Sequence, residues 1–377
     1  MRNKTSTIAL AAAGLLAAAT AFAQTTTHET SAGPVTATVM TDDLSHPWGM
    51  AFLPDGSVLV TEREGRLRLF ADGALSAPMS GVPEVADTGQ GGLLDVAIAN
   101  DFAETGIIFL SFSEPGRGGQ GTAIARARLV RDGGSARLED VRVIFSMAQK
   151  TRSGRHFGSR IVPAPDGTIF FTIGDRGDDE RAQDMNDHAG AVLRINPDGS
   201  VPRDNPWTEK DGTQPELWSK GHRNPQGATW DPVTDSLWIT EHGARGGDEL
   251  NNPQRGRNYG WPVISYGEHY SGAKIGVGTE APGYEQPEFY WDPSIAPSGL
   301  TVYDGNMFSE WQGDFLAGAL KFQLVSRVER GANGEIGPEE RMFEGAFGRI
   351  RDIEVASDGS IWLITDEDPG QMIRIAR

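Results

Sequence analysis

The stretch H-P-W-G-M-A-F-L-P-D-G-S-V-L-V-T-E-R-E-G-R-L-R-L-F, residues 46–70, sets the architecture of this chain. It contains three short apolar runs, separated by turn signals at residues 54–56 (P-D-G) and 64–65 (E-G). Pro and Gly supply the φ values that tight turns need, and the alternation of β-branched and polar residues is typical of half-buried strands. The stretch therefore predicts consecutive antiparallel strands.

Five further copies of this pattern follow along the chain, and they begin near Gly92, Phe157, Gly227, Gly299 and Ile350. Their spacing varies between about 45 and about 70 residues, which a ring of small sheets tolerates because insertions can sit in the connecting loops. The repeats predict an all-β fold, a six-bladed β-propeller with four-stranded antiparallel blades. Two stacked sandwiches are the alternative, but nothing between the copies resembles an interdomain linker.

The two ends of the repeat region are also predicted to be strands. Residues 35–39 (V-T-A-T-V) and residues 372–375 (M-I-R-I) both alternate, and we expect them to share one blade and close the ring. The predicted organisation is a signal peptide over residues 1–23, an N-terminal linker over residues 24–34 and a single catalytic propeller domain over residues 35–377.

The signal peptide is predicted from the first residues of the chain. Arg2 and Lys4 precede an apolar run over residues 8–21, and Ala21-Phe22-Ala23 has the A-x-A form of a cleavage site. A membrane anchor is the alternative, but the run is short for a span of roughly 20 residues. We therefore expect a protein without stable membrane insertion, exported to the periplasm or secreted.

Composition excludes several classes of protein. The chain has 377 residues with 48 Gly, 22 Pro and no Cys, so a helix bundle, a disulfide framework and Cys-ligated metals are excluded. The formal net charge of −18 argues against nucleic acid as a partner. Redox chemistry in such a chain needs a bound cofactor. The G-x-G-x-x-G at residues 116–121 joins two predicted strands, so we interpret it as a hairpin loop and not as a dinucleotide site.

Charged loop residues predict a local cationic pocket in this acidic protein. Arg223, Lys321, Arg349 and Arg351 lie at comparable positions in different repeats, so a closed ring would bring them to one face. Such a cluster predicts an anionic ligand. The alternative is that these cations pair with local acids such as Asp352 and Glu354.

Two kinds of reactive group lie in the same loops. Asp248 and Glu249 in the Gly-rich segment 241–251 offer oxygen ligands suited to Ca²⁺, although acids beside Gly are often simply turn residues. His156, His222 and His242 could each act as a general base, and residue chemistry alone does not rank them. No H-x-x-x-H spacing supports a zinc site.

A series of motifs gives the chain a family resemblance. In order they are G-Q-G-G-L-L-D-V, R-H-F-G-S-R, G-D-R-G, G-H-R-N-P-Q-G, E-H-G-A-R-G-G-D-E-L-N, N-Y-G-W-P, I-A-P-S-G-L, G-A-L-K and G-R-I-R-D. From about His46 to Ile375 the chain resembles the soluble pyrroloquinoline quinone (PQQ)-dependent sugar dehydrogenases. It looks most like the aldose sugar dehydrogenase branch of the glucose/sorbosone dehydrogenase family, whose members are six-bladed propellers.

The resemblance implies specific roles for residues that match the family motifs. His156 would be the catalytic base, and the quinone contacts would be Gln90, Arg223, Asn224, Tyr270, Lys321, Arg349 and Arg351. Backbone carbonyls of Gly243 and Ala244 would hold one Ca²⁺, and Glu249 and Tyr259 a second. The chain departs from the family pattern at Ala244, where Pro is common. It also departs at Arg155, where the better-known glucose dehydrogenase branch has an Asp beside the catalytic His.

The implied activity is oxidation of an aldose at C1 to the lactone. Hydride would pass to PQQ, and the electrons to an external acceptor such as a quinone, a cytochrome or a dye. A calcium-dependent propeller lactonase and a non-catalytic carbohydrate-binding propeller are the alternatives. A monomer and a homodimer are both compatible with the sequence.

Overall fold

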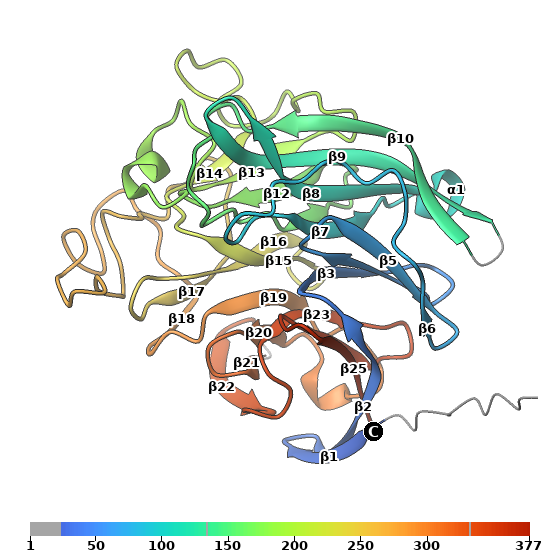
Figure 1. The fold of residues 1–377 in the computed structure, drawn as a ribbon. Helices are drawn as coiled ribbons and strands as arrows, with labels where there is room; N and C mark the ends of the chain where they lie inside the picture. Colours follow the sequence, from blue (N-terminus) through green and yellow to red (C-terminus); the bar gives the residue numbers. More distant parts are fainter. Residues whose placement is uncertain (1–23, 133–134, 332) are drawn as a thin grey trace, which may run out of the picture.

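The computed structural model describes residues 24–132, 135–331 and 333–377. Its strands form six antiparallel sheets arranged around a central axis, which confirms the predicted six-bladed propeller (Figure 1). The predicted signal peptide, residues 1–23, lies outside the described residues. Within them, no helix has the length and apolar character that a membrane span requires.

Each of the first three blades is built from four consecutive strands. Blade 1 contains β3 (Pro47–Phe52), β4 (Val58–Glu62), β5 (Arg66–Ala71) and β6 (Ala74–Leu75). Blade 2 contains β7 (Leu93–Ile98), β8 (Ile107–Gly116), β9 (Gly119–Asp132) and β10 (Ser135–Ser146). Blade 3 contains β11 (Ile161–Pro163), β12 (Ile169–Ile173), β13 (Ala191–Ile195) and β14 (Leu217–Lys220).

Two further blades follow the same order, and the sixth combines both ends of the chain. Blade 4 contains β15 (Pro225–Asp231), β16 (Ser236–Glu241), β17 (Asp248–Asn251) and β18 (Phe289–Trp291). Blade 5 contains β19 (Pro297–Val302), β20 (Phe315–Ala319), β21 (Leu324–Arg330) and β22 (Ile336–Met342). Blade 6 contains β23 (Ile350–Val355), β24 (Ile361–Thr365), β25 (Gly370–Ala376), β2 (Gly33–Leu44) and β1 (Thr25–Thr30). The short helices are α1 (Phe102–Thr105), η1 (Asp179–Gln183) and η2 (Ser309–Trp311), the last two of the 3₁₀ type.

The first strand of each blade is the innermost one. Strands β3, β7, β11, β15, β19 and β23 contact one another in this order, and β23 contacts β3 again, so the ring is closed. The predicted closure is confirmed because β2 pairs with β25, with Ala37 opposite Ile375 and Val39 opposite Ile373. The G-x-G-x-x-G segment is a tight hairpin in which Gly116 lies opposite Gly119 of the next strand, as predicted.

The expected linker over residues 24–34 is wrong, because this segment contains β1 and the start of β2. The Thr-rich β1 pairs with β2 and adds a fifth strand to blade 6. Gly33, at φ 88°, allows the turn between them. Ser31 fixes the turn to blade 5 by donating from its hydroxyl to Glu340 at 2.6 Å.

Buried hydroxyl groups link neighbouring blades at equivalent positions. Ser111 Oγ of β8 donates to the carbonyl of Ser159 at 2.6 Å, and Thr172 Oγ1 of β12 donates to the carbonyl of Pro225 at 2.9 Å. Thr61 and Thr240 make the corresponding contacts from blades 1 and 4. Each bond satisfies a buried carbonyl that the sheet ladder leaves free, so the blades are joined by polar bonds as well as by apolar packing.

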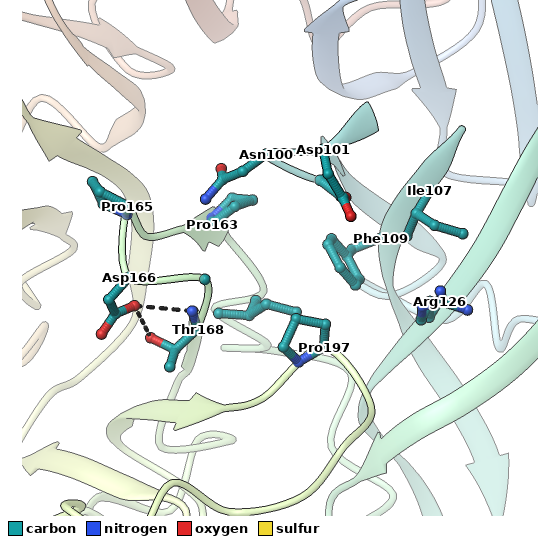
Figure 2. Close-up of a pocket in the computed structure, with 13 residues that line it drawn as sticks. Asn100, Asp101, Ile107, Phe109, Arg126, Pro163, Pro165, Asp166, Thr168 and Pro197 are labelled. Atoms are coloured by element: carbon teal, nitrogen blue, oxygen red, sulfur yellow. Dashed lines mark hydrogen bonds between the residues drawn. The ribbon is translucent and has the colours of Figure 1, made fainter. Parts of the chain in front are cut away.

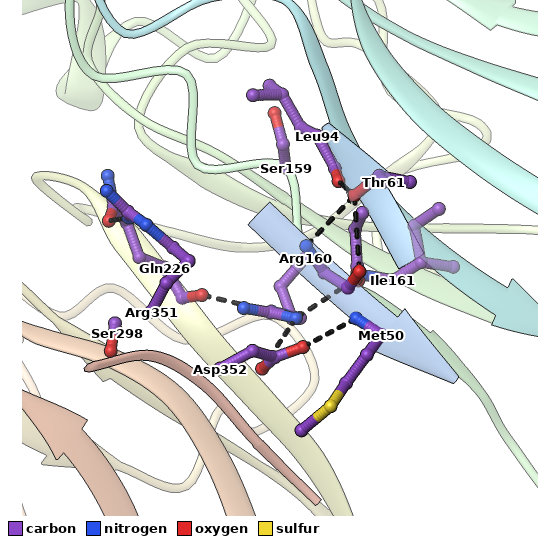
Figure 3. Close-up of polar contacts among 12 residues, drawn as sticks. Met50, Thr61, Leu94, Ser159, Arg160, Ile161, Gln226, Ser298, Arg351 and Asp352 are labelled. Atoms are coloured by element: carbon purple, nitrogen blue, oxygen red, sulfur yellow. Dashed lines mark hydrogen bonds and ion pairs between the residues drawn. The ribbon is translucent and has the colours of Figure 1, made fainter. Parts of the chain in front are cut away.

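A polar layer crosses the axis on the inner strands (Figure 3). Arg160 Nη1 lies 2.9 Å from Asp95 Oδ1 and 3.0 Å from Asp352 Oδ1, and its Nε donates to the carbonyl of Gln226. Asp352 therefore pairs with Arg160. Among the described residues it pairs with neither Arg349 nor Arg351; these two arginines pair with a different acid, Asp366, so the alternative of local acid pairing holds for them with another partner.

Candidate active site

Blade topology brings the predicted site residues to one face. The loops before each innermost strand and the loops after each second strand lie at the same end of the antiparallel blades. Gln90, His156 and Arg223 precede β7, β11 and β15, and Gly243 follows β16. Residues at equivalent positions of successive repeats therefore lie together around the axis, at one end of the blades.

His156 forms a hydrogen-bonded pair with Asp175. His156 Nδ1 lies 2.6 Å from Asp175 Oδ1, with 13% of the histidine side chain and 2% of the aspartate side chain exposed. An ionised carboxylate can only accept, so Nδ1 carries the proton and Nε2 keeps its lone pair. Burial lowers the pKa of His156, and the charge of Asp175 only partly offsets this effect. A neutral imidazole with a free Nε2 is suited to act as a general base near pH 7.

The loop that carries His156 is held by the residues that follow β12. Arg176 donates to the carbonyls of Arg155 and Ser153, and its guanidinium lies 3.4 Å from the centre of the Phe157 ring. His156 has φ 55°, a left-handed conformation that needs such support. Gly174 is required for close approach, because a Cβ there would lie 2.4 Å from the carbonyl oxygen of His156.

The surroundings of the other two loop histidines, His222 and His242, make them unsuited to act as the general base. His222 is fully buried, with Nδ1 2.8 Å from Glu241 Oε1 and Nε2 2.8 Å from Ser219 Oγ, so both ring nitrogens are occupied. His242 Nε2 bonds the carbonyl of Pro297 at 2.7 Å. Burial lowers the pKa of His242 to about 3, with a further contribution from Arg223. Of the three candidates, His156 alone combines a carboxylate partner on one nitrogen with a second nitrogen that has no hydrogen-bond partner among the described residues.

A cavity of about 210 Å³ opens at the axis beside this pair. Gln90 connects the two, since its Oε1 accepts a hydrogen bond from the backbone N–H of His156 at 2.7 Å and the residue also lines the cavity. The polar and aromatic residues that line it are Trp48, Arg63, Gln90, Gln226, His242, Arg349, Arg351 and Asp366. The cavity wall therefore carries three arginines and one acid.

Asp366 is the acid that pairs with the cavity arginines. Its Oδ2 lies 2.6 Å from Arg351 Nη2 and 3.4 Å from Arg349 Nη2. Burial opposes ionisation of this carboxyl, but the arginine charges outweigh it and hold the pKa of Asp366 well below its usual range. Gln226 fixes Arg351 from the other side, at 2.9 Å. The predicted cationic cluster is thus partly neutralised from within.

Several donors around the axis have no acceptor within the described part of the chain. They are buried nitrogen atoms, namely Nε of Arg63, Arg223 and Arg351 and Nδ2 of Asn224. Leaving a buried donor unpaired is costly. Arg63 and Arg351 also line the axial cavity with Arg349, against Asp366 as the acid of that wall, so the residues present fit an anionic quinone cofactor.

Oxygen groups suited to a cation lie in the segment after β16. Glu249 and Tyr259 line a cavity of about 10 Å³ together with Glu241. Burial, and next the charge of Glu241, raise the pKa of Glu249 to about 8. Among the described residues, no Lys or Arg pairs with Glu249, so a Ca²⁺ ion would supply the missing charge. The Gly243 carbonyl already accepts a hydrogen bond from Arg223 Nη1 at 2.5 Å, and the Tyr259 hydroxyl is likewise engaged by the Gln254 N–H and the Asn252 carbonyl, so the Glu249 carboxyl is the group that best fits an ion. Asp248 is instead engaged in structural bonds to Gly243, Ser294 and Ala296.

Not every predicted residue reaches the cavity. Tyr270 is 76% exposed in a turn between Glu268 and Lys274 and does not line it. Lys321 is exposed next to Leu320, a lining residue, and its ammonium lies 5.0 Å from the centre of the Phe322 ring. Their roles as cofactor contacts stay predictions.

The sequence reasoning missed five residues of the site: Arg63, Asp175, Arg176, Gln226 and Asp366. Asp175 and Arg176 belong to the G-D-R-G motif, which directly follows a predicted strand of the same repeat as His156. Their position directly after the second strand of this repeat could have predicted that Asp175 and Arg176 lie on the same face as His156. Asp366, which follows the equivalent strand of the last repeat, offered the same signal.

The larger cavities lie elsewhere. One of about 360 Å³ is formed by residues of blades 2 and 3, with Phe109, Arg126, Pro163 and Asp166 on its wall (Figure 2). None of the predicted site residues lines it. Its size therefore does not identify it as the site of chemistry.

The fold and this site define a six-bladed propeller with a His–Asp pair beside an arginine-lined cavity. The sequence model of the glucose/sorbosone dehydrogenase family matches residues 44–374, and the chain belongs to this family. It is 42% identical over 344 residues to aldose sugar dehydrogenase YliI of Escherichia coli K12, covering 90% of this chain and 92% of that protein.

Solved structures agree with the family assignment. The soluble aldose sugar dehydrogenase of E. coli in its apo form superimposes with a TM-score of 0.87 at 41% identity, covering 91% of this chain and 99% of that one. The PQQ-bound aldose sugar dehydrogenase of Streptomyces coelicolor gives a TM-score of 0.75 at 25% identity, covering 94% and 98%.

Proposed function

We propose that this protein is a PQQ- and calcium-dependent aldose sugar dehydrogenase that oxidises the sugar at C1 to the lactone. The observation that carries the proposal is the His156–Asp175 pair, which lies beside an arginine-lined cavity in a chain with no Cys. The family assignment and the PQQ-bound relative support the choice of cofactor.

The chain's own residues have distinct tasks in this proposal. Arg349, Arg351, Arg223 and Lys321 provide counter-charge for the cofactor carboxylates, and Asn224 and Gln90 position it. When bound, PQQ supplies an o-quinone that takes up the two electrons of the sugar as hydride. His156 Nε2 accepts the proton of the anomeric hydroxyl, while Asp175 holds the ring and stabilises the imidazolium that forms.

Calcium is assigned to oxygen groups of the same face. Carbonyls of Gly243 and Ala244 would hold one ion near the cofactor, provided that Arg223 releases the Gly243 carbonyl. Glu249 and Tyr259 would hold a second ion that stabilises the fold. We further propose that the electrons leave through an external acceptor and that the protein is exported, as its first residues suggest.

The test is reconstitution of the purified metal-free protein with PQQ and Ca²⁺, followed by dye reduction with a series of aldoses. Saturable, PQQ-dependent oxidation is expected. His156→Ala should lower kcat by roughly 10²–10⁴-fold, whereas His269→Ala, the same change in an exposed loop, should leave it unaltered. Absence of PQQ-dependent oxidation would refute the proposal, and lactone hydrolysis without PQQ would favour a lactonase.

A further inference from the structure

Arg63 is a cavity residue that the predicted site does not include. It follows β4 and lines the axial cavity with Arg349 and Arg351. Its Nη1 donates to the carbonyl of Gly89 at 2.9 Å, next to the cofactor contact Gln90. Its Nε is buried without an acceptor, and no acid within 4.0 Å pairs with it in the described part of the chain. Arg63 therefore lacks the direct acid partner that Arg349 and Arg351 have, and the charge of Asp366 acts on it only from a greater distance.

Asp366 is the only acid among the residues that line this cavity. Its carboxylate is 9% exposed and contacts Arg351 and Arg349 through Oδ2, while Oδ1 lies 3.6 Å from His46 Nδ1. An anion of the protein itself thus lies where an external anion would contact the same arginines. The contact with Arg349 is long, at 3.4 Å, and the Arg349 side chain is 43% exposed, so this arginine is only loosely held.

We propose that Arg63 is an additional anion-binding residue of the axial cavity, and that Asp366 acts there as an internal counter-anion that selects ligands with several carboxylates. This inference rests on the proposed function, and it adds two residues and a specificity rule to it. A ligand with one carboxylate gains little, because Asp366 already neutralises part of the charge. A ligand with several carboxylates also reaches Arg63 and Arg349, and so outweighs the repulsion from Asp366.

The first test measures ligand binding to the protein supplied with saturating Ca²⁺ by tryptophan fluorescence, since Trp48 lines the cavity. The probes are PQQ and benzene-1,3,5-tricarboxylate. Arg63→Gln should weaken binding of both probes at least tenfold. Arg66→Gln is the matched control, because Arg66 lies three residues further on, pairs with Glu62 and Glu64, and does not line the cavity. Equal affinities of Arg63→Gln and wild type would overturn the role of Arg63.

The second test removes the internal anion. Asp366→Asn should bind both probes at least fivefold more tightly and should become sensitive to competition by benzoate, a monocarboxylate that leaves the wild type unaffected. If a folded Asp366→Asn protein binds PQQ more weakly than the wild type, the proposed role of Asp366 as a counter-anion is wrong. Asp366 would then serve only to orient Arg351. Urea unfolding of each variant reports whether it is folded.

The two probes separate this inference from the proposed function. If the tricarboxylate binds in an Arg63-dependent way and PQQ does not, the anion site is supported while the PQQ-dependent activity is refuted. If neither probe binds the wild type saturably, both are refuted.

Discussion

Asp175 contacts two side chains at once, with Oδ1 2.6 Å from His156 Nδ1 and Oδ2 accepting from the indole N–H of Trp261 at 2.9 Å. Trp261 lies in the long connection between β17 and β18 of blade 4, whereas Asp175 and His156 belong to blade 3. The orientation of the proposed base therefore depends on contacts between two blades.

Replacing Asp175 tests this arrangement. Asp175→Asn keeps the shape but permits the other His156 tautomer, so kcat for sugar oxidation should fall by roughly 10²–10⁴-fold. Trp261→Phe removes only one of the three bonds to the carboxylate and should cost much less. Steady-state dye reduction measures both, and an Asp175→Asn enzyme with wild-type kcat would contradict the assigned role.

The pH profile follows from the burial of His156. The base must be neutral to accept a proton, and burial lowers its pKa from an ordinary value near 6.5. The acid limb of kcat/KM, which reports the free enzyme, should therefore have its midpoint below 6.5. Because the Asp175 carboxylate favours the charged imidazolium, Asp175→Asn should move this midpoint to still lower pH. A midpoint that rises in the variant would argue against the pair.

The sequence predicted the fold and the shared face, and the family resemblance pointed to His156, but neither supplied the partners of His156. The six repeats are visible because turn residues and apolar runs follow one another locally. Asp175 and Asp366 are separated from their partners along the chain and look like ordinary turn acids. Their roles depend on distances across the face, which no periodicity encodes. At position 155 the chain has Arg where the glucose dehydrogenase branch has an Asp beside the catalytic His. The carboxylate that orients His156 here is that of Asp175.

Gly174 offers a test of the backbone beneath the base. A Cβ at this position would lie 2.4 Å from the His156 carbonyl oxygen, so Gly174→Ala should displace the loop and reduce kcat. The stability cost should be about 1–3 kcal/mol, as for other overpacked positions. Gly167→Ala is the control, since it has open space within 4 Å and only its φ of 85° is strained. Equal kcat in the two variants would contradict this explanation.

Calcium should stabilise the protein through Glu249. At free Ca²⁺ about 100-fold above its Kd, the free energy of unfolding should rise by about 2.7 kcal/mol. Glu249→Gln should abolish this gain while leaving the metal-free protein at least as stable, because repulsion from Glu241 is removed. Glu104→Gln, an exposed acid in α1, is the matched control. Thermal unfolding with and without chelator measures the effect, and a full calcium response in Glu249→Gln would place the ion elsewhere.

The hydroxyl bonds between blades should carry measurable stability. Ser111 Oγ donates to the Ser159 carbonyl at 2.6 Å and accepts from the Asp95 N–H at 2.8 Å. Ser111→Ala leaves both groups buried and unpaired, so the free energy of unfolding should fall by about 1–3 kcal/mol. Ser271→Ala, in an exposed turn, should change little. Urea unfolding compares them, and equal midpoints would show that the hydroxyl is dispensable.

The pairing of β2 with β25 has a consequence for how the molecule is made. Five blades consist of strands that follow one another in the chain, so each can form as soon as it is synthesised. The sixth blade forms later, because β2 can pair with β25 only after residues 370–376 have been synthesised. A chain that stops before Gly370 would keep five complete blades but expose β24 as an unpaired edge, which promotes aggregation. The edges of β24 and β2 are covered only once β25 is present. Chains that lack β25 therefore differ from chains that contain it by exposed strand edges, which proteases and chaperones can recognise.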